Sequence, residues 1–356
     1  MNICGFGTAV PRLAIAQDDA AALSAELVCR DARQARMLRV LFRRAGVERR
    51  HSVLLESTAM PWQSFYPPRQ SDTDRGPSTG ARMESYEQHA VGLAHTASRR
   101  ALAASGVSPG EISHLLTVSC TGFFAPGIDA GLVSKLGLQP EVTRAHLGFM
   151  GCHGLFNALA LARPIVLSNP EARILVCAVE LCSLHYSYLW DSEKLVANAL
   201  FADGAAALVI GGSEPAMRVL NQGSTLLLDS ADAMTWRIGD HGFEMTLSST
   251  LPTLIRDDAA QWVLRWLAAQ GLRPDEVGTW AIHPGGPRIL DAFADALDLD
   301  AGSLALSRKA LERYGNMSSA TIGFILAAAR EQGFTGPGVA IGLGPGLTVE
   351  AMLFDA

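Results

Sequence analysis

The stretch Gly106-Val107-Ser108-Pro109-Gly110-Glu111-Ile112 returns as Gly271-Leu272-Arg273-Pro274-Asp275-Glu276-Val277, which begins 165 positions later. Each copy ends a helical pattern with glycine, turns through proline and leads into a short apolar run. The same offset carries the strand-like run 172–181 onto 337–346, and Cys152 at the start of one helical stretch onto Met317 at the start of another. A helix–strand turn of this type is common by itself, but three features in one register indicate an internal duplication.

Short apolar runs alternate with helical patterns along the whole chain, which indicates an α/β protein. The runs are nearly continuous, as expected for strands that are buried on both faces, and they lie at 115–118, 174–179, 207–210 and 339–343. Helical spacing of apolar residues is found at 86–105, 155–168 and 258–270. We expect two similar halves, residues 1–215 and 216–356, packed about a pseudo-dyad. In such an arrangement the loops that follow corresponding strands meet near the axis.

The composition excludes several classes of function. Of the 356 residues, 49% are hydrophobic and 18% are charged, as in a well-buried globular protein. The net charge of −6 lacks the basic excess that binding to nucleic acid requires. Six cysteines are scattered without a CxxC pair, which favours a reducing compartment over a disulfide framework or a metal site. With no signal peptide and no apolar run of about 18 residues, we expect a cytoplasmic protein without a membrane span.

Cys152 is the candidate nucleophile, in the segment Gly151-Cys152-His153-Gly154 at the start of a helical pattern. Gly151 permits a tight turn, and the free N–H groups at a helix start direct partial positive charge toward the sulfur. Both features are expected to lower the thiol pKa and to favour the nucleophilic thiolate. A cysteine that only fills space is the usual alternative, and we accept it for Cys4, Cys29 and Cys177.

An imidazole and a carboxamide complete the candidate set. His283 follows the strand-like Trp280-Ala281-Ile282 and precedes Pro284-Gly285-Gly286-Pro287, so a rigid turn fixes it at a strand end. There it can pair with a thiolate and donate to a developing oxyanion. Asn316, in Tyr314-Gly315-Asn316-Met317-Ser318-Ser319, can cap a helix, or its amide can donate to a thioester carbonyl. Two such donors would stabilise the enolate that remains when a malonyl group loses CO2.

These motifs, with Gly344-Pro345-Gly346-Leu347-Thr348-Val349-Glu350 near the C-terminus, resemble the type III polyketide synthases. This family is the chalcone-synthase-like branch of the thiolase fold, and the resemblance covers essentially the whole chain. It implies a five-layered αβαβα architecture, with Cys152 as the acyl carrier. It also implies that His283 and Asn316 help to decarboxylate malonyl-CoA. Members of the family are homodimers that use free coenzyme A thioesters as substrates, so no metal or other cofactor is expected.

The resemblance also implies residues that line the substrate cavity. Phe201 matches the first of two aromatic side chains between the CoA tunnel and the cavity, and Met245 falls where the second usually stands. Plain core packing is an equal alternative for Met245. Cys182 and His185 are more similar to the bacterial alkylresorcinol and alkylpyrone enzymes than to plant chalcone synthases. We expect both, together with Cys120, to line the cavity, and we interpret Cys182 and Cys120 as neutral lining groups rather than as second nucleophiles.

A cluster of arginines is the candidate CoA-binding surface. It lies in a predominantly helical stretch that ends near Gly46, and it comprises Arg30, Arg33, Arg36, Arg39, Arg43, Arg44, Arg49 and Arg50. A solvated helix face is the simpler interpretation. Arginine also binds phosphate groups bidentately, as the 3′-phosphate and pyrophosphate of CoA require. The family uses basic residues from this region, and we expect Arg44, followed by Arg43 or Arg36, to contact CoA.

The sequence thus predicts an iterative decarboxylative Claisen condensation of an acyl-CoA starter with malonyl-CoA. The segment around Cys182 and His185, with Met245, favours a fatty acyl starter, and cyclisation would give a pyrone, resorcinol or phloroglucinol-type product. One alternative is a fatty-acid-initiating ketosynthase that condenses once, onto an acyl carrier protein. Another is a non-catalytic thiolase-fold partner that only binds acyl chains, although such proteins typically lack the nucleophile.

Overall fold

A mixed sheet of nine strands carries both halves of the chain, in the order β11-β12-β13-β8-β1-β7-β6-β4-β5. The computed structural model describes residues 1–60, 62–212, 216–334 and 336–355. The two parts of the sheet meet where Asn2 and Ile3 of β1 pair with Arg218 and Met217 of β8. The strands are β1 (Asn2–Ala9), β4 (His114–Ser119), β5 (Thr143–Gly148), β6 (Ile174–Leu181), β7 (Asp203–Ile210), β8 (Met217–Leu226), β11 (Thr279–Ile282), β12 (Gly338–Gly344) and β13 (Thr348–Asp355).

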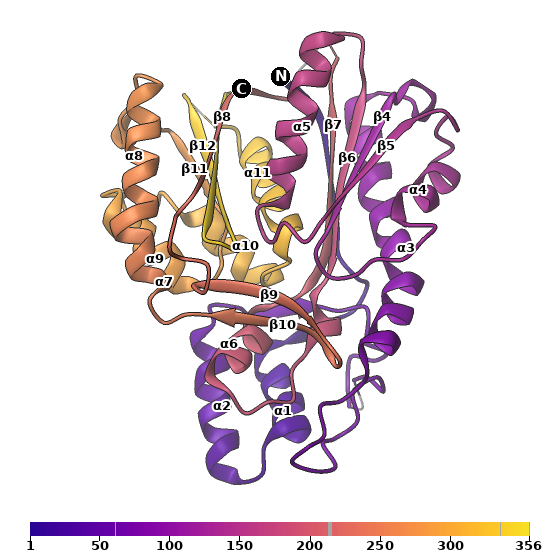
Figure 1. Cartoon of the computed structure of the whole chain (residues 1–356), viewed down its shortest axis with the longest axis vertical. Coiled ribbons are helices and arrows are strands. Elements are labelled where there is room, and N and C mark those ends of the chain that lie inside the picture. Colours follow the sequence, from indigo (N-terminus) through magenta and orange to yellow (C-terminus); the bar gives the residue numbers. More distant parts are fainter. Residues whose placement is uncertain (61, 213–215, 335, 356) are drawn as a thin grey trace.

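Helices cover both parts of the sheet and also separate them, which gives the predicted five layers (Figure 1). α3 (Thr79–Ser105) and α4 (Ile128–Leu136) pack on the outer face of the first part. α8 (Ala260–Ala269) and α9 (Pro287–Ala296) pack on the outer face of the second. α5 (Gly154–Ser168) and α11 (Thr321–Gln332) form the layer between them. The predicted thiolase-like α/β class is confirmed.

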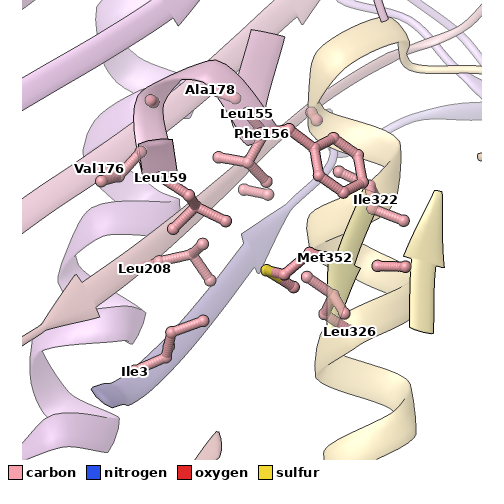
Figure 2. Close-up of a cluster of buried hydrophobic side chains, with 14 of the residues drawn as sticks. Ile3, Leu155, Phe156, Leu159, Val176, Ala178, Leu208, Ile322, Leu326 and Met352 are labelled. Atoms are coloured by element: carbon pink, nitrogen blue, oxygen red, sulfur yellow. The ribbon is translucent and has the colours of Figure 1, made fainter. Parts of the chain in front are cut away.

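The middle layer forms the central core of the molecule (Figure 2). Leu155 and Leu159 of α5 and Ile322 of α11 are each at most 1% exposed. They pack against β-strand residues from both halves, which include Val176, Leu208 and Met352. Because nearly every side chain of β6, β7 and β12 is buried, these strands are apolar on both faces, as their continuous apolar sequences predict.

The internal repeat is visible as structure. The two copies of the repeat, residues 106–112 and 271–277, contain matching 3-10 turns, Pro109–Glu111 and Pro274–Glu276. In each, the glutamate side chain reaches back to the main-chain N–H of the residue before the proline, at 2.8 Å from Ser108 and 2.8 Å from Arg273. Each turn leads into a parallel strand, β4 or β11. The predicted boundary between the halves, after residue 215, borders on 213–215, which lie outside the described residues.

A smaller layer of structure lies below the sheet in Figure 1. It contains α1 (Gln17–Val28), α2 (Ala32–Arg44), α6 (Ser192–Leu200) and the hairpin of β9 (Met234–Gly239) and β10 (Gly242–Leu247). Further elements are β2 (Ala14–Ala16), which pairs with β3 (Arg49–His51), and the helices α7 (Leu251–Leu254) and α10 (Ala305–Tyr314). Within the described ranges, every helix is too short or too polar to cross a bilayer.

Candidate active site

Cys152 lies in the connection between β5 and α5, directly before the helix cap His153. Gly151 before it has φ +80, a left-handed conformation that disfavours other residues. A Cβ at this position would overlap the ring of Pro345, so glycine is also required by the close approach of the 344–346 turn. The local sequence therefore places the sulfur at the junction of the two halves, where Cys152 lines a cavity.

The environment of the sulfur differs from the sequence-based expectation. Burial raises the pKa of the Cys152 thiol to about 12, although the polar side chains of Ser318 and Asn316 near the sulfur lower the pKa. Helix α5 begins only at Gly154, so the sulfur lies outside its first turn. The prediction that the helix start would give a low-pKa thiol is therefore wrong, because desolvation outweighs the local donors. The thiol is protonated at neutral pH.

Asn316 follows the end of α10 and is held by its main chain. Its N–H donates to the carbonyl of Leu200 and its carbonyl accepts from the N–H of Ala202, both at 2.9 Å. Its side-chain oxygen accepts from the N–H of Ser318 at 2.8 Å, as a capping asparagine would. The amide oxygen is thereby committed, and the NH2 group is left to donate to the Cys152 sulfur. Capping and a chemical role are thus compatible.

Ser318 is the second polar side chain near the sulfur, and its backbone is strained. Its φ of +47 is unusual for a residue with a side chain, and it is 5% exposed. Such a conformation costs on the order of 1–3 kcal/mol, and it persists only where the surroundings impose it. The strain turns the Ser318 side chain toward Cys152 within the cavity lining.

His283 lies at the end of β11, where its N–H donates to the carbonyl of Ile341 at 2.8 Å. The register of β11 with β12 places it beside Gly342. Burial, followed by the nearby charge of His153, lowers the pKa of His283 to about 3. Among the described residues, neither ring nitrogen of His283 has a hydrogen-bond partner. The imidazole is therefore neutral and available to an incoming group.

A cavity of about 300 Å³ brings together most of the residues singled out in the sequence. Its lining includes Cys152 with the five residues expected to shape the substrate site: Cys120, Cys182, His185, Phe201 and Met245. His283 and Asn316 lie outside this lining, and both are only 2% exposed. The side chains of Arg36, Arg43 and Arg44 on α2 are exposed and also lie outside it, and Arg43 pairs with Asp18 at 3.3 Å.

An aromatic wall, which sequence reasoning missed, closes one side of this cavity. The ring of His185 stacks on Phe243 with centroids 4.2 Å apart, and Trp236 meets it edge-on. His185 Nε2 lies 2.7 Å from the carbonyl of Thr121, and Phe243 N–H donates to Nδ1 at 2.9 Å. Trp236 Nε1 donates to the carbonyl of Cys120 at 2.7 Å. The backbone thus fixes all three rings.

Glu180 is a second feature that the sequence analysis did not use. It is fully buried at the end of β6, where burial raises its pKa. Its carboxylate accepts from the hydroxyls of Thr121 (2.7 Å) and Ser319 and from the N–H of Cys120 (3.0 Å). The available signal was a single acidic residue in an otherwise apolar strand. Glu180 joins the segment of Cys120 to that of Asn316.

Comparison with known proteins agrees with this geometry. Residues 1–215 match the N-terminal domain of the chalcone and stilbene synthases, and residues 219–356 match the C-terminal domain. The chain is 36% identical to the Mycobacterium tuberculosis protein named "Alpha-pyrone synthesis polyketide synthase-like Pks18", over 99% of this chain and 90% of that one. It is 32% identical to the 1,3,6,8-tetrahydroxynaphthalene synthase of Streptomyces peucetius, over 99% and 92%.

Solved structures give the same result. The polyketide synthase PKS-I of the brown alga Ectocarpus siliculosus superposes with a TM-score of 0.91 at 28% identity, covering 99% of this chain and 97% of that one. The 1,3,6,8-tetrahydroxynaphthalene synthase of Streptomyces coelicolor, a bacterial type III polyketide synthase, superposes with a TM-score of 0.89 at 26% identity, covering 99% of both. The chain belongs to the chalcone and stilbene synthase family and is a type III polyketide synthase, an acyltransferase that condenses an acyl-CoA starter with malonyl-CoA.

Proposed function

We propose that Cys152 is the nucleophile of an iterative condensation and that His283 is its base. Because burial keeps both groups neutral, the thiol proton passes to His283 as the sulfur attacks the starter thioester. The tetrahedral intermediate then collapses, CoA leaves as the thiolate, and that thiolate takes the proton from His283. The observation that carries this proposal is that Cys152 and Ser318 line the same cavity, with the side chains of Ser318 and Asn316 close enough to the sulfur to lower its pKa.

His283 and Asn316 also stabilise the enolate in the extension step. When the malonyl group loses CO2, negative charge develops on the oxygen of the thioester carbonyl. The ring nitrogens of His283 have no partner among the described residues, and the NH2 group of Asn316 is a donor. The enolate carbon then attacks the Cys152 thioester, and the lengthened chain returns from CoA to the sulfur for another round.

The cavity supports a fatty acyl starter rather than an aromatic one. Beyond the region of Cys152, its lining continues into apolar side chains of α1 and of other segments, namely Leu23 and Leu27 of α1 with Ile15, Leu54 and Leu55. Met245, at the throat with Phe201, is a flexible side chain that adapts to different occupants. Cyclisation would release a pyrone, resorcinol or phloroglucinol-type product. The name of the M. tuberculosis relative, which refers to α-pyrone synthesis, favours the pyrone.

A product assay by mass spectrometry tests this function. The purified protein is incubated with malonyl-CoA and with acetyl, long fatty acyl or aromatic CoA thioesters. We expect cyclic products from the fatty acyl starters, and no extension by Cys152→Ala. Cys29→Ala is the matched control, since Cys29 is not part of the cavity lining, and it should extend normally. Extension by Cys152→Ala would exclude Cys152 as the nucleophile. Products from aromatic starters alone would exclude a fatty acyl starter.

Arg44, with Arg43 and Arg36, is proposed to bind the phosphates of CoA. All three are exposed on α2, and Arg43 and Arg44 stand in its last turn. Arg44→Ala should raise KM for malonyl-CoA severalfold with little change in kcat, because a phosphate contact contributes equally before and during the reaction. Arg330→Ala, at the end of α11, provides a control of the same type. An unchanged KM for all three α2 variants would place the CoA site elsewhere.

The two halves, 1–215 and 216–356, are proposed as domains that are active only together. Cys152 comes from the first, whereas His283 and Asn316 come from the second. The main-chain hydrogen bonds between Asn316 and the 200–202 segment join them at the site. Halves expressed separately should be inactive, and activity from either half alone would contradict this assignment of the domains.

A cytoplasmic location is also proposed, because six free cysteines are typical of a protein in a reducing compartment.

A homodimer built on the β5 edge is proposed as the working form. β5 ends the nine-stranded sheet, and all its residues except Leu147 are exposed. An exposed edge of this kind is a template for pairing with another strand. Beside it, Phe149 and Met150 are exposed, as is Leu161 on α5. Leu161→Arg should convert a dimer to a monomer in analytical ultracentrifugation. The exposed Leu228, beyond β8, offers Leu228→Arg as the control; a monomeric wild type would refute the proposal.

A further inference from the structure

Lys194 is a largely buried lysine in the lining of the cavity, and it has no role in the steps above. It lies in the first turn of α6 and is 8% exposed. Its Nζ donates to the main-chain carbonyl of Met245 at 2.8 Å and to Oε2 of Glu244 at 3.3 Å. Both acceptors belong to β10, which is drawn next to α6 in Figure 1. Lys194 therefore ties α6 to the strand that carries Met245.

This position is unfavourable for a lysine in two ways. The first turn of a helix carries partial positive charge, which repels a cation. A lysine is also seldom buried, because its ammonium group then loses hydration. The helix does not require this side chain for its start, since Asp191 caps α6 by accepting from the main-chain N–H groups of Glu193 and Lys194. The contacts to β10, rather than the stability of α6, account for a lysine here.

The hydrogen bond to the Met245 carbonyl is the stronger of the two contacts. The side chain of Glu244 is 56% exposed, so solvent screens its ion pair with Lys194. The carbonyl bond is short and has a charged donor, which makes it roughly twice as strong as a neutral hydrogen bond. The preceding residue of α6, Glu193, accepts from the N–H of Leu247 at 3.2 Å. Two successive residues of α6 thus hold the main chain of β10 at two points.

The same helix also carries Phe201, the other residue of the proposed throat. Phe201 directly follows the last residue of α6, and its N–H donates to the carbonyl of Ala197 at 3.1 Å. Phe201, Lys194 and Met245 all line the cavity. Helix α6 therefore joins the two throat residues, one through its C-terminal end and the other through Lys194.

We propose that Lys194 is a positioning residue for the choice of starter, because it fixes the main chain of Met245 relative to Phe201 with α6 as the spacer. A pocket discriminates between starters only if its walls keep their places, since each contact contributes a small difference. Without the ammonium group, β10 loses its bond to α6 at Met245, and the throat loses its fixed width. The inference rests on the proposed function, in which Met245 takes part in selecting the starter.

The ratio of kcat/KM for a long fatty acyl starter to kcat/KM for acetyl-CoA tests the inference. A general loss of active protein lowers both values by the same factor and leaves this ratio unchanged. Lys194→Met keeps most of the stem and removes the donor, and we expect the ratio to fall by about tenfold, the scale of one pocket contact. Lys194→Arg keeps a charged donor and should preserve most of the ratio. Lys309→Met, on the exposed side of α10, is the matched control and should coincide with wild type.

The Met245→Ala background shows whether Lys194 acts through Met245. In this background Lys194→Met should leave the ratio unchanged, whereas an equal fall in both backgrounds would overturn the inference. Glu244→Gln removes the ion pair and keeps the carbonyl bond, so a fall as large as that of Lys194→Met would also overturn it. Should Lys194→Met fail to fold, Lys194→Gln takes its place, because the shorter amide stops short of the Met245 carbonyl.

Failure of the proposed function gives a different result from failure of this inference. A wild type that extends no fatty acyl starter would contradict the proposed function. A wild type that extends these starters, with a ratio unaffected by Lys194→Met, would overturn the role of Lys194 alone.

Discussion

Asn316 and Phe201 are held together by their main chains, although they come from different halves of the molecule. The two hydrogen bonds of Asn316, to Leu200 and Ala202, flank residue 201 and form an isolated bridge outside the main sheet. The side chain of Phe201 lines the cavity, and that of Asn316 is near enough to the Cys152 sulfur to lower its pKa. The proposed throat of the cavity and the proposed enolate-stabilising amide therefore occupy one rigid unit.

Because the backbone holds Asn316, its side chain can be removed without moving Phe201. We expect Asn316→Ala to lower the rate of malonyl-CoA decarboxylation by about 10²–10³, the usual cost of deleting one oxyanion donor. The release of CO2 measures this step, and intact-mass detection of the acylated protein shows that Cys152 still reacts. Ser318→Ala is the comparison, because it removes the other donor to the sulfur; the decarboxylation rate should fall much less than in Asn316→Ala. Equal losses in the two variants would assign no special role to Asn316.

Met245 is expected to control the size of the starter at the throat. Met245→Phe places a rigid ring opposite Phe201, and kcat/KM for a long fatty acyl starter should fall by about tenfold or more, in line with the 1–3 kcal/mol that a pocket contact contributes. The value for an acetyl starter should change little. Met245→Leu preserves volume and flexibility and serves as the control. If Met245→Phe reduced kcat/KM for both starters by the same factor, Met245 would have only a packing role.

The sequence was sufficient to predict the frame of the molecule and to select six residues that line one cavity, Cys152 with the five expected to shape the substrate site. Continuous apolar runs mark β4, β6, β7 and β12 because these strands are covered on both faces, and the repeat at 106 and 271 reappears as two equal turns. The thiol pKa could not be predicted, since it depends on burial by segments distant in the chain. The stacking of Phe243 on His185 could not be predicted for the same reason. It forms only because the β9–β10 hairpin packs against residues 182–185.

Glu180 and Ser319 form a hydrogen bond that joins the two halves in the core. Glu180→Ala would leave the hydroxyls of Thr121 and Ser319 and the N–H of Cys120 without their acceptor. Each unsatisfied buried donor costs about 1–3 kcal/mol, so we expect the free energy of unfolding to fall by several kcal/mol. Ser319→Ala removes one bond and should cost about 1–2 kcal/mol. Urea denaturation measures both, and a loss for Glu180→Ala no larger than that for Ser319→Ala would contradict the account.

His185 should make the fold sensitive to acid. Burial lowers its pKa from 6.5 to about 3, and its Nδ1 is committed to accepting from Phe243 N–H. As the pH falls below 6.5, the imidazole of His185 becomes protonated in the unfolded chain, whereas in the folded chain it stays neutral until about pH 3. Stability is therefore lost on acidification across this range, by about 1.4 kcal/mol per pH unit for each such proton.

His185→Gln removes this proton while keeping the geometry, because a glutamine amide can donate to the carbonyl of Thr121 and accept from Phe243 N–H. We expect its free energy of unfolding to decrease less steeply between pH 6.5 and pH 4 than that of wild type, with the slope reduced by one proton. His241→Gln, the same substitution on the exposed β9–β10 turn, is the control, and a change of slope shared by both variants would not be assigned to His185. Denaturant titrations at successive pH values give these slopes. Parallel curves for His185→Gln and wild type would show that His185 accepts its proton in the folded state, and that the aromatic wall does not depend on the neutral ring.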